Sequence, residues 1–377
     1  MGRSSSSPQR FSASIMGNCN YSEEAQAPVV LQARTQFSFL APIGKGGFGR
    51  VWKVQAKRSK QLFAMKEMHK GRVLLRHSVS AVMNERKLLT RLSHPFLVNM
   101  HGAFQDRDSL YLVLDYLEGG DLRYHLGKKR CFTEQQSRFF VGCILLALEY
   151  LHQKHIIHRD LKPENIVFDS KGYLRVTDLG ISRDFRQNNA CDTSGTPGYM
   201  APEVMTRQSH KLAVDFFALG VMTYEFMLGK RPYSGPTRKA IRESMLAKQA
   251  RVSAEELPQG WSPQAADFVN QLIQRRPATR LGYLGAKEVM AHPWLADFPW
   301  KQLRSKQLKA PFLPYECGNI DRKTVNADWK DDEKALTAAL YHCQQDHLFD
   351  GYFYDPLGRK PLSDLPPLTH NSPLKSA

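Results

Sequence analysis

Hydrophobic and polar residues alternate in the first third of the chain in a way that predicts β-strands. Three such segments, residues 37–43, 49–57 and 61–68, are separated by glycine-rich or polar turns. Residues 78–92 instead place apolar side chains at helical spacing, and residues 110–117 form a short apolar strand. This part of the sequence therefore predicts a sheet accompanied by one amphipathic helix.

The pattern becomes helical after this point. Residues 135–153 are a long, largely apolar segment that predicts a buried helix. Residues 213–228, 236–248 and 262–274 show further helical patterns. A β-rich part followed by a helix-rich part predicts an α+β fold with two lobes.

Composition marks the ends of the folded region. Residues 1–36, with much Ser, Gln and Ala, predict a disordered N-terminal arm, and residues 361–377 predict a disordered end. Between them we expect a domain at residues 37–295, with a small lobe at about 37–117 and a large lobe at about 118–295, followed by a tail at residues 296–360.

Charge and cysteine usage narrow the class of protein. The net charge is +17, but Lys and Arg are spread along the chain, which indicates no nucleic-acid partner. The positive charge could reflect attraction to an anionic membrane or to an acidic partner, or simply a solvated basic surface. There is no hydrophobic leader and no apolar run near the roughly 20 residues that cross a bilayer. Six scattered cysteines favour a reducing compartment, so we expect an intracellular, cytoplasmic protein of undetermined oligomeric state.

A glycine-rich segment, IGKGGFGRV at residues 43–51, joins the first two predicted strands. Glycines at such a turn let the main chain approach phosphate groups and donate N–H bonds to them. The segment lacks the Gly-Lys-Ser/Thr ending of a Walker loop. By itself it could equally be a plain hairpin turn.

Two charged residues follow at positions that support phosphate binding. Lys66 lies on the third predicted strand, in AMK, and Glu85 lies on the amphipathic helix. An ion pair between them would orient the Lys66 ammonium toward a nucleotide phosphate while keeping it charged.

The most specific signal is HRDLKPENIVFD at residues 158–169, followed by DLG at residues 178–180. Asp160 is suited to orient a hydroxyl nucleophile and accept its proton, and Lys162 to neutralise a γ-phosphate. Asn165 and Asp178 offer the hard oxygen ligands that Mg²⁺ prefers. Together these residues predict phosphoryl transfer.

With these motifs, residues 37–295 resemble the eukaryotic protein kinases. The resemblance implies ATP and Mg²⁺ as cofactors, a Lys66–Glu85 pair, and protein substrates phosphorylated on Ser or Thr, since Lys162 follows HRDL. It also implies that Glu203 pairs with Arg280 and that Asp215 braces the catalytic loop. The nucleotide-binding residues that it implies are Ile43, Gly44, Lys45, Gly46, Gly47, Phe48, Gly49, Arg50, Val51, Ala64, Lys66, Asp115, Leu117 and Asp121.

The subgroup is indicated by HPFLVNM, GGDLRYHL and APFLP, which resemble AGC-type kinases, and GGDLRYHL with IIHRDLKPEN is most similar to their YANK branch. Asp121, Glu164 and Glu225 match AGC positions that bind basic residues before the acceptor. This implies a preference for basic substrates, because carboxylates select Arg through charge-assisted hydrogen bonds. In the alternative reading these carboxylates are solvated or contact the ribose.

The segment FDGYFYDP, residues 349–356, resembles the AGC hydrophobic motif. Phe349, Tyr352 and Tyr354 would then anchor the AGC-like tail in a groove beside the Glu85 helix. A surface aromatic patch or a strand in a disordered tail is the alternative. Phe353 stands where related motifs carry Ser or Thr, so this chain lacks that phosphorylation site.

The segment CDTSGTPGYMAPE, residues 191–203, contains a second departure of the same kind. Asp192 stands where AGC relatives carry a phosphothreonine, and Arg159 and Arg183 are the cations that would bind it. A carboxylate supplies part of the charge of a phosphate. We therefore expect activity that does not depend on phosphorylation here, with a switch moved to Thr193 as the alternative.

Two readings concern localisation and activity. Gly2 fits a loose myristoylation pattern, and a start at Met16 would place Gly17 beside Cys19, which implies peripheral membrane association. A plain disordered arm is the alternative. A pseudokinase scaffold is the alternative to an active enzyme.

Overall fold

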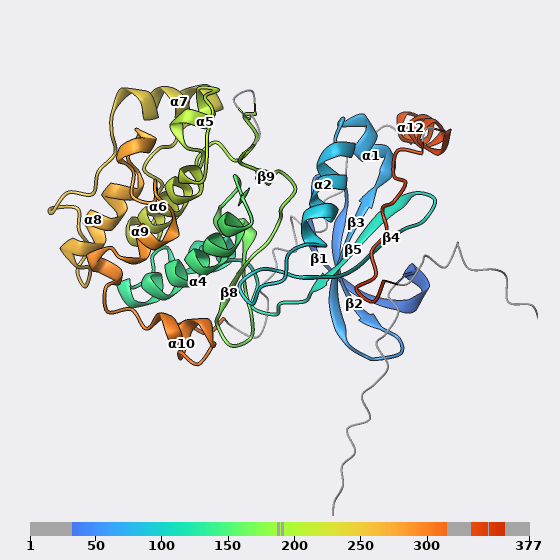
Figure 1. The fold of residues 1–377 in the computed structure, drawn as a ribbon, viewed down its shortest axis with the longest axis horizontal. Coiled ribbons are helices and arrows are strands. Elements are labelled where there is room, and N and C mark those ends of the chain that lie inside the picture. The colour runs from blue at the N-terminus through green and yellow to red at the C-terminus, as the bar shows by residue number, and fades with distance from the viewer. Residues whose placement is uncertain (1–31, 187–188, 190–191, 315–332, 346, 359–377) are drawn as a thin grey trace, which may run out of the picture. The chain divides into compact units, whose positions relative to one another are not determined.

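The computed structural model describes residues 32–186, 189, 192–314, 333–345 and 347–358 (Figure 1). The candidate acylation sites, the end predicted as disordered and most of the predicted N-terminal arm lie outside these residues. Within them, a sheet precedes a set of helices along the chain, which confirms the predicted α+β fold of two lobes.

The small lobe is built on an antiparallel sheet in the order β1-β2-β3-β5-β4. Four strands lie within or close to the segments that the alternating pattern predicted, whereas β4 was not predicted. The strands are β1 (Phe37–Lys45), β2 (Arg50–Ala56), β3 (Leu62–His69), β4 (Met100–Gln105) and β5 (Ser109–Asp115).

Two helices accompany the sheet, α1 (Lys70–Leu75) and α2 (Val79–Leu89). The second corresponds to the predicted amphipathic helix, and it buries Val82, Glu85 and Leu89 against the lobe's core. A buried glutamate on this otherwise apolar face requires a partner, because an isolated buried charge is costly. The pairing of Glu85 therefore decides how this helix contributes to the site.

The large lobe is centred on α4 (Glu134–Gln153), most of whose residues are buried, and on α6 (Ala213–Leu228), which is almost completely buried. Thr133 begins α4 as a capping box with Gln136, which satisfies main-chain N–H groups at the start of the helix. The surrounding helices are α3 (Leu122–Lys129), α5 (Pro202–Met205), α7 (Arg238–Ala247), α8 (Pro263–Leu272), α9 (Ala286–Met290) and α10 (Trp300–Arg304).

Short strands and one 3₁₀ helix carry the loops that lie next to the sheet. They are β6 (Ile156–Ile157), η2 (Pro163–Asn165), β7 (Ile166–Phe168), β8 (Leu174–Val176) and β9 (Arg183–Asp184), and the other 3₁₀ helices are η1 (Arg34–Gln36), η3 (Pro277–Thr279) and η4 (Pro293–Leu295). The pairings β6–β9 and β7–β8 hold the HRDLKPEN and DLG segments side by side. The two most specific motifs of the sequence therefore share one scaffold.

A buried ion pair connects α5 to the end of α8 and the loop beyond it. Arg280 donates from Nη1 and Nη2 to the two carboxylate oxygens of Glu203, at 2.6 and 2.9 Å. Its guanidinium also lies 4.9 Å from the centre of the Phe217 ring and donates to the Ala213 carbonyl. Every group of this cluster is therefore paired inside the lobe.

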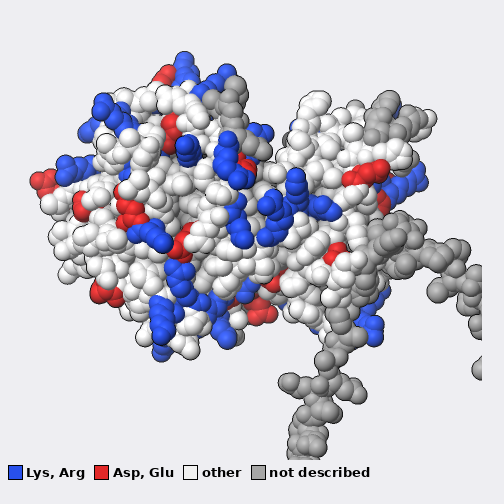
Figure 2. All heavy atoms as spheres, viewed as in Figure 1, with Lys and Arg blue, Asp and Glu red and all other residues white. Residues whose placement is uncertain are grey.

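Surface charge is mixed on the face shown in Figure 2. Lys and Arg lie in several separate groups, with Asp and Glu among them. Within the described residues, no helix is both long enough and apolar enough to span a membrane.

Candidate active site

A cavity of about 610 Å³ lies between the sheet and the loops of the large lobe. It is of the size that holds a small-molecule ligand. Of the residues predicted to bind nucleotide, thirteen line it, and Arg50 at the start of β2 does not. The lining ones are Ile43, Gly44, Lys45, Gly46, Gly47, Phe48, Gly49, Val51, Ala64, Lys66, Asp115, Leu117 and Asp121.

The glycine-rich turn closes one side of this cavity. The Gly46 N–H donates to the Gly49 carbonyl at 2.8 Å, which folds the turn back on itself. A Cβ on Gly49 would lie 1.8 Å from the carbonyl oxygen of Glu67. Only glycine fits there, so the turn can lie directly on β3 and present its main chain to the cavity.

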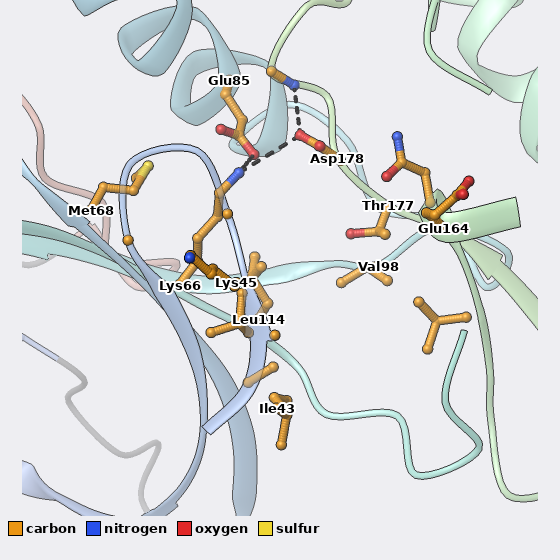
Figure 3. Close-up of a pocket in the computed structure, with 18 of the residues that line it drawn as sticks. Ile43, Lys45, Lys66, Met68, Glu85, Val98, Leu114, Glu164, Thr177 and Asp178 are labelled. Carbon is orange, nitrogen blue, oxygen red and sulfur yellow. Dashed lines mark hydrogen bonds and ion pairs between the residues drawn. The ribbon is translucent and has the colours of Figure 1, made fainter. Parts of the chain in front are cut away.

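Lys66 joins three elements at the back of the cavity. Its Nζ lies 2.7 Å from Glu85 Oε1 on α2 and 3.7 Å from Asp178 Oδ1, as Figure 3 shows. Burial acts to lower the pKa of Lys66, but the two carboxylates raise it above its ordinary value overall. Lys66 in turn lowers the pKa of Asp178. The cavity therefore contains a fixed positive charge beside an ionised carboxylate.

Asp160 accepts hydrogen bonds from four donor atoms. Its Oδ1 accepts from the Thr196 hydroxyl at 2.7 Å and the Thr196 N–H at 3.0 Å. Its Oδ2 accepts from Lys162 Nζ at 2.7 Å and Asn165 Nδ2 at 3.2 Å. The Lys162 ammonium also donates to the Thr196 hydroxyl at 2.9 Å. Thr196 was not predicted as a site residue, although it lies in the segment CDTSGTPGYMAPE, residues 191–203.

Asn165 and Asp178 supply oxygen atoms that suit a hard divalent cation. The Asn165 amide nitrogen is used by Asp160, to whose carbonyl it also donates at 2.9 Å, so the amide oxygen is the atom left for a ligand. Both residues line the same cavity. A carboxylate and an amide oxygen fit Mg²⁺, which takes few protein ligands and relies on substrate phosphates for others.

Asp215 on α6 fixes the loop that carries these residues. Its completely buried carboxylate accepts from the N–H groups of His158 and Arg159, at 2.9 and 2.8 Å, and from His152 Nε2 at 2.8 Å. Arg159 and Asp178 both have positive φ angles, 68° and 64°. Such angles are unfavourable for these residue types and persist only where the surroundings enforce them. Asp215 supplies part of that enforcement.

The activation segment brings Asp192 to the two predicted arginines. Its Oδ2 lies 2.5 Å from Arg159 Nη1 and 3.4 Å from Arg183 Nε. Burial acts to raise the pKa of Asp192, but Arg159 lowers it below its ordinary value overall. Thr193 is partly exposed, and its carbonyl accepts from Arg238 at 2.7 Å. The side chain that meets the cations is therefore that of Asp192.

The three carboxylates predicted to bind substrate have different surroundings. Asp121 accepts from the Tyr124 N–H at 2.8 Å as the cap of α3 and lines the cavity, and burial raises its pKa. Glu164 and Glu225 both pair with Arg123, which was not predicted from the sequence as part of the site. Its Nε lies 2.8 Å from Glu164 Oε1, and its Nη1 lies 2.8 Å from Glu225 Oε1. The structure therefore brings together two of the three carboxylates around an internal cation.

The tail returns to the small lobe. Helix α12 (Glu333–Gln345) packs on α1, and Phe349 and Tyr352 after it are buried. Tyr354 is half-buried and pairs with Ala103 of β4 through its own N–H and carbonyl, at 2.9 and 3.0 Å. Arg86 of α2 donates to the Phe353 carbonyl. The tail thus contacts the helix that carries Glu85.

Tyr352 gives a direct test of this docking. Replacing Tyr352 with Ala is expected to cost about 3–5 kcal/mol of folding free energy, because a completely buried ring leaves a cavity behind. Its hydroxyl has no hydrogen-bond partner among the described residues. Tyr352→Phe is the matched control and should keep or raise the melting temperature, since it removes only that unsatisfied group. Equal melting temperatures for the Ala and Phe variants would contradict the docking.

Comparison with known proteins identifies the class to which this site belongs. Residues 37–295 match the family described as the protein kinase domain. The match spans more than half of the chain, and the chain therefore belongs to this family.

Individual relatives specify the class further. A probable serine/threonine-protein kinase of Dictyostelium discoideum is 34% identical over 89% of this chain and 74% of its own length. The RAC family serine/threonine-protein kinase homolog of the same organism is 34% identical over 84% and 71%. Ribosomal protein S6 kinase alpha-3 of Homo sapiens is 38% identical over 74% of this chain and 38% of its own length. The chain is a protein serine/threonine kinase with AGC-type relatives.

Proposed function

We propose that this chain transfers the γ-phosphoryl group of ATP to Ser or Thr hydroxyls of protein substrates, with Asp160 as the residue that accepts the proton. Family membership implies ATP as the substrate and, in general, Mg²⁺. The observation that supports the proposal most is the shared cavity. It holds the Lys66–Glu85 pair, Asp160 and the oxygen donors of Asn165 and Asp178.

Each residue has a role that follows from its contacts. Lys66, held by Glu85, would bind nucleotide phosphates as a fixed cation, and the glycine-rich turn would cover them. Mg²⁺, held by Asn165 and Asp178, would neutralise charge that develops on the phosphates. The other contribution to the rate is the positioning of the reacting groups, because these residues are already held in place before the substrate binds.

Asp160 can accept the proton only if one of its present donors leaves. Its two oxygens offer about four lone-pair sites, and four donors fill them. Lys162 is the donor that a γ-phosphate would attract, because its ammonium is a mobile point charge. When Lys162 turns to the phosphate, Oδ2 becomes free for the acceptor hydroxyl.

Phosphate transfer from labelled ATP to a Ser/Thr peptide library tests the proposal against a scaffold without activity. Wild-type protein should label peptides well above the level of an Asp160→Ala variant. Equal labelling by the two proteins would favour the scaffold. The pairing of Lys66 with Glu85 argues against that outcome, since the phosphate-binding cation is already in place.

We further propose that activity does not require phosphorylation of the activation segment, because Asp192 already pairs with Arg159 and Arg183. Asp192→Asn is expected to lower kcat about tenfold, since a charge-assisted contact contributes about 1.5–3 kcal/mol. Thr193→Ala should leave kcat unchanged. Kinetics on wild type and both variants as purified, with their phosphorylation state determined by mass spectrometry, measure both effects. The reverse pattern would place the switch at Thr193.

The pH dependence of this contact separates a carboxylate from a phosphate. Because the pKa of Asp192 is lowered on folding, its stabilising effect is present above the ordinary Asp value near 4 and is lost only as pH falls through the lowered value. A phosphate changes charge near pH 6. The contribution of Asp192 to activity should therefore be constant between pH 6 and 8.

The finer assignments are also proposals. We assign the chain to the YANK-like branch of the AGC kinases on the GGDLRYHL and HRDLKPEN motifs, and we propose cytoplasmic location with peripheral membrane association through Gly2 or Gly17. A preference for basic residues before the acceptor rests on Asp121, Glu164 and Glu225. Arg123 already pairs with Glu164 and Glu225, which weakens the attraction of these two carboxylates for a substrate arginine.

A further inference from the structure

Arg123 lies between the two carboxylates that a basic substrate residue would use. It is the second residue of α3, directly after Asp121 and Leu122. Its Nε donates to Glu164 Oε1 at 2.8 Å, and its Nη1 donates to Glu225 Oε1 at 2.8 Å. Nη2 donates to Glu225 Oε2 at 3.3 Å and to the Tyr199 hydroxyl. One guanidinium therefore uses both acids at once.

The geometry is that of a filled binding site for arginine. A planar guanidinium binds a carboxylate best with two parallel N–H bonds, which is how Arg123 meets Glu225. The Tyr199 hydroxyl donates to Glu225 Oε2 at 2.5 Å and completes the site. The Arg123 side chain is one-third exposed (33%), whereas that of Glu225 is 8% exposed. The occupant and Glu164, whose side chain is 45% exposed, are accessible to solvent, whereas Glu225 is buried.

A second cation lies on the other side of Tyr199. The Arg231 guanidinium is 5.6 Å from the centre of the Tyr199 ring. A Cβ on Gly198 would lie 2.0 Å from Arg231 Nη1, so the absence of a side chain at Gly198 makes room for this arginine. The surroundings of the two carboxylates are therefore less acidic than their number suggests.

We propose that Arg123 is an intramolecular occupant of the basic-residue subsite formed by Glu164 and Glu225, so that the enzyme does not select arginine at that subsite. This inference rests on the proposed kinase activity and concerns which substrates it selects. A substrate arginine can bind Glu164 and Glu225 only by displacing Arg123. Because one guanidinium then replaces another in the same contacts, a substrate arginine adds little binding free energy there.

Paired peptides test the inference directly. Two Ser peptides would differ only in having Arg or Ala at the second and third positions before the acceptor. For wild type, the ratio of kcat/KM for the Arg peptide to that for the Ala peptide should stay below about threefold. In Arg123→Leu it should rise at least about tenfold, mainly through KM, because the subsite is then empty and acidic. A wild-type ratio above tenfold, or an unchanged ratio in Arg123→Leu, would overturn the proposal.

Further variants separate occupancy from a structural role. Arg123→Lys keeps a cation beside both acids and should keep the ratio near that of wild type. Arg123→Gln keeps a hydrogen-bond donor for Glu225 but removes the charge. It should therefore raise the ratio as predicted for Arg123→Leu, and it tests the proposal if the Leu variant does not fold. Lys128→Leu removes an exposed cation from the same helix and should change nothing. A raised ratio in Lys128→Leu would mean that overall charge, and not occupancy, sets the selection.

Binding measurements distinguish failure of this inference from failure of the proposed function. If no protein phosphorylates either peptide, the kinase proposal fails. Fluorescence anisotropy with labelled Arg and Ala peptides then still measures the ratio of Kd values without turnover. A tighter Arg peptide in Arg123→Leu and Arg123→Gln supports occupancy. Equal ratios in all variants would refute it.

Discussion

Asp160→Asn is expected to lower kcat by about 10²–10⁴-fold, the usual contribution of a positioned general base. The amide cannot accept a proton from the acceptor hydroxyl. It also presents an NH₂ group to donors that now point at a carboxylate, the Thr196 hydroxyl and the Lys162 ammonium. The loss should therefore appear in kcat, while the Kd for ATP should change little, because the residues predicted to bind the nucleotide are others.

The measurement is steady-state phosphate transfer together with ATP titration. Asp297→Asn is a suitable control, because its side chain is 82% exposed and, among the described residues, its ion-pair partner is Arg138 on the surface of the large lobe. It should retain wild-type kcat. An Asp160→Asn protein that folds, binds ATP and keeps more than about a tenth of wild-type kcat would remove Asp160 from the proposed role.

Arg280→Leu is expected to produce a large loss of stability. The Glu203 side chain is 3% exposed, and without Arg280 its charge would be buried and unpaired. Breaking such a pair from one side costs about 3–5 kcal/mol. The carbonyl of Ala213 also loses its donor. We expect the melting temperature to fall by at least about 5 °C, since 1 kcal/mol corresponds to roughly 2–4 °C in domains of 150–250 residues.

A surface ion pair is the matched control for this variant. Lys239 and Glu243 lie 3.9 Å apart on α7, and both side chains are more than half exposed. Exposed pairs of this kind contribute about 0–1 kcal/mol. Lys239→Met should therefore hardly change the melting temperature. If it lowers the melting temperature as much as Arg280→Leu, burial does not explain the strength of the Glu203 pair.

The catalytic cluster could be predicted from sequence because each of its members lies in a short motif. Asp160, Lys162 and Asn165 fall within six residues, and the distance from DLG is fixed by two short strands. The contact of Asp192 with Arg159 was predictable for the same reason, since both positions are defined by neighbouring motifs. Arg123 was not predictable in this way. Its partners lie 41 and 102 residues further along the chain, and only the fold brings them together.

The fold was predictable where the periodic pattern was long. The segments around β1, β2, β3, α2, α4 and α6 repeat an apolar position often enough to fix their type. Strand β4 was missed because MHGAFQ contains a glycine and alternates poorly. Helix α1 has six residues, one of them glycine, which weakens its helical pattern. Such elements are stabilised by contacts that no local pattern records.

The tail has a consequence for how the protein behaves at high concentration. Strand β4 is the last in the sheet order, so within the described residues no further strand of the sheet lies beside its outer N–H and carbonyl groups. Uncovered edges of this kind pair readily with other chains and promote aggregation. Tyr354 satisfies both main-chain groups of Ala103 and so blocks the middle of that edge. The aromatic tail therefore also acts as a solubility element for the sheet against which it lies.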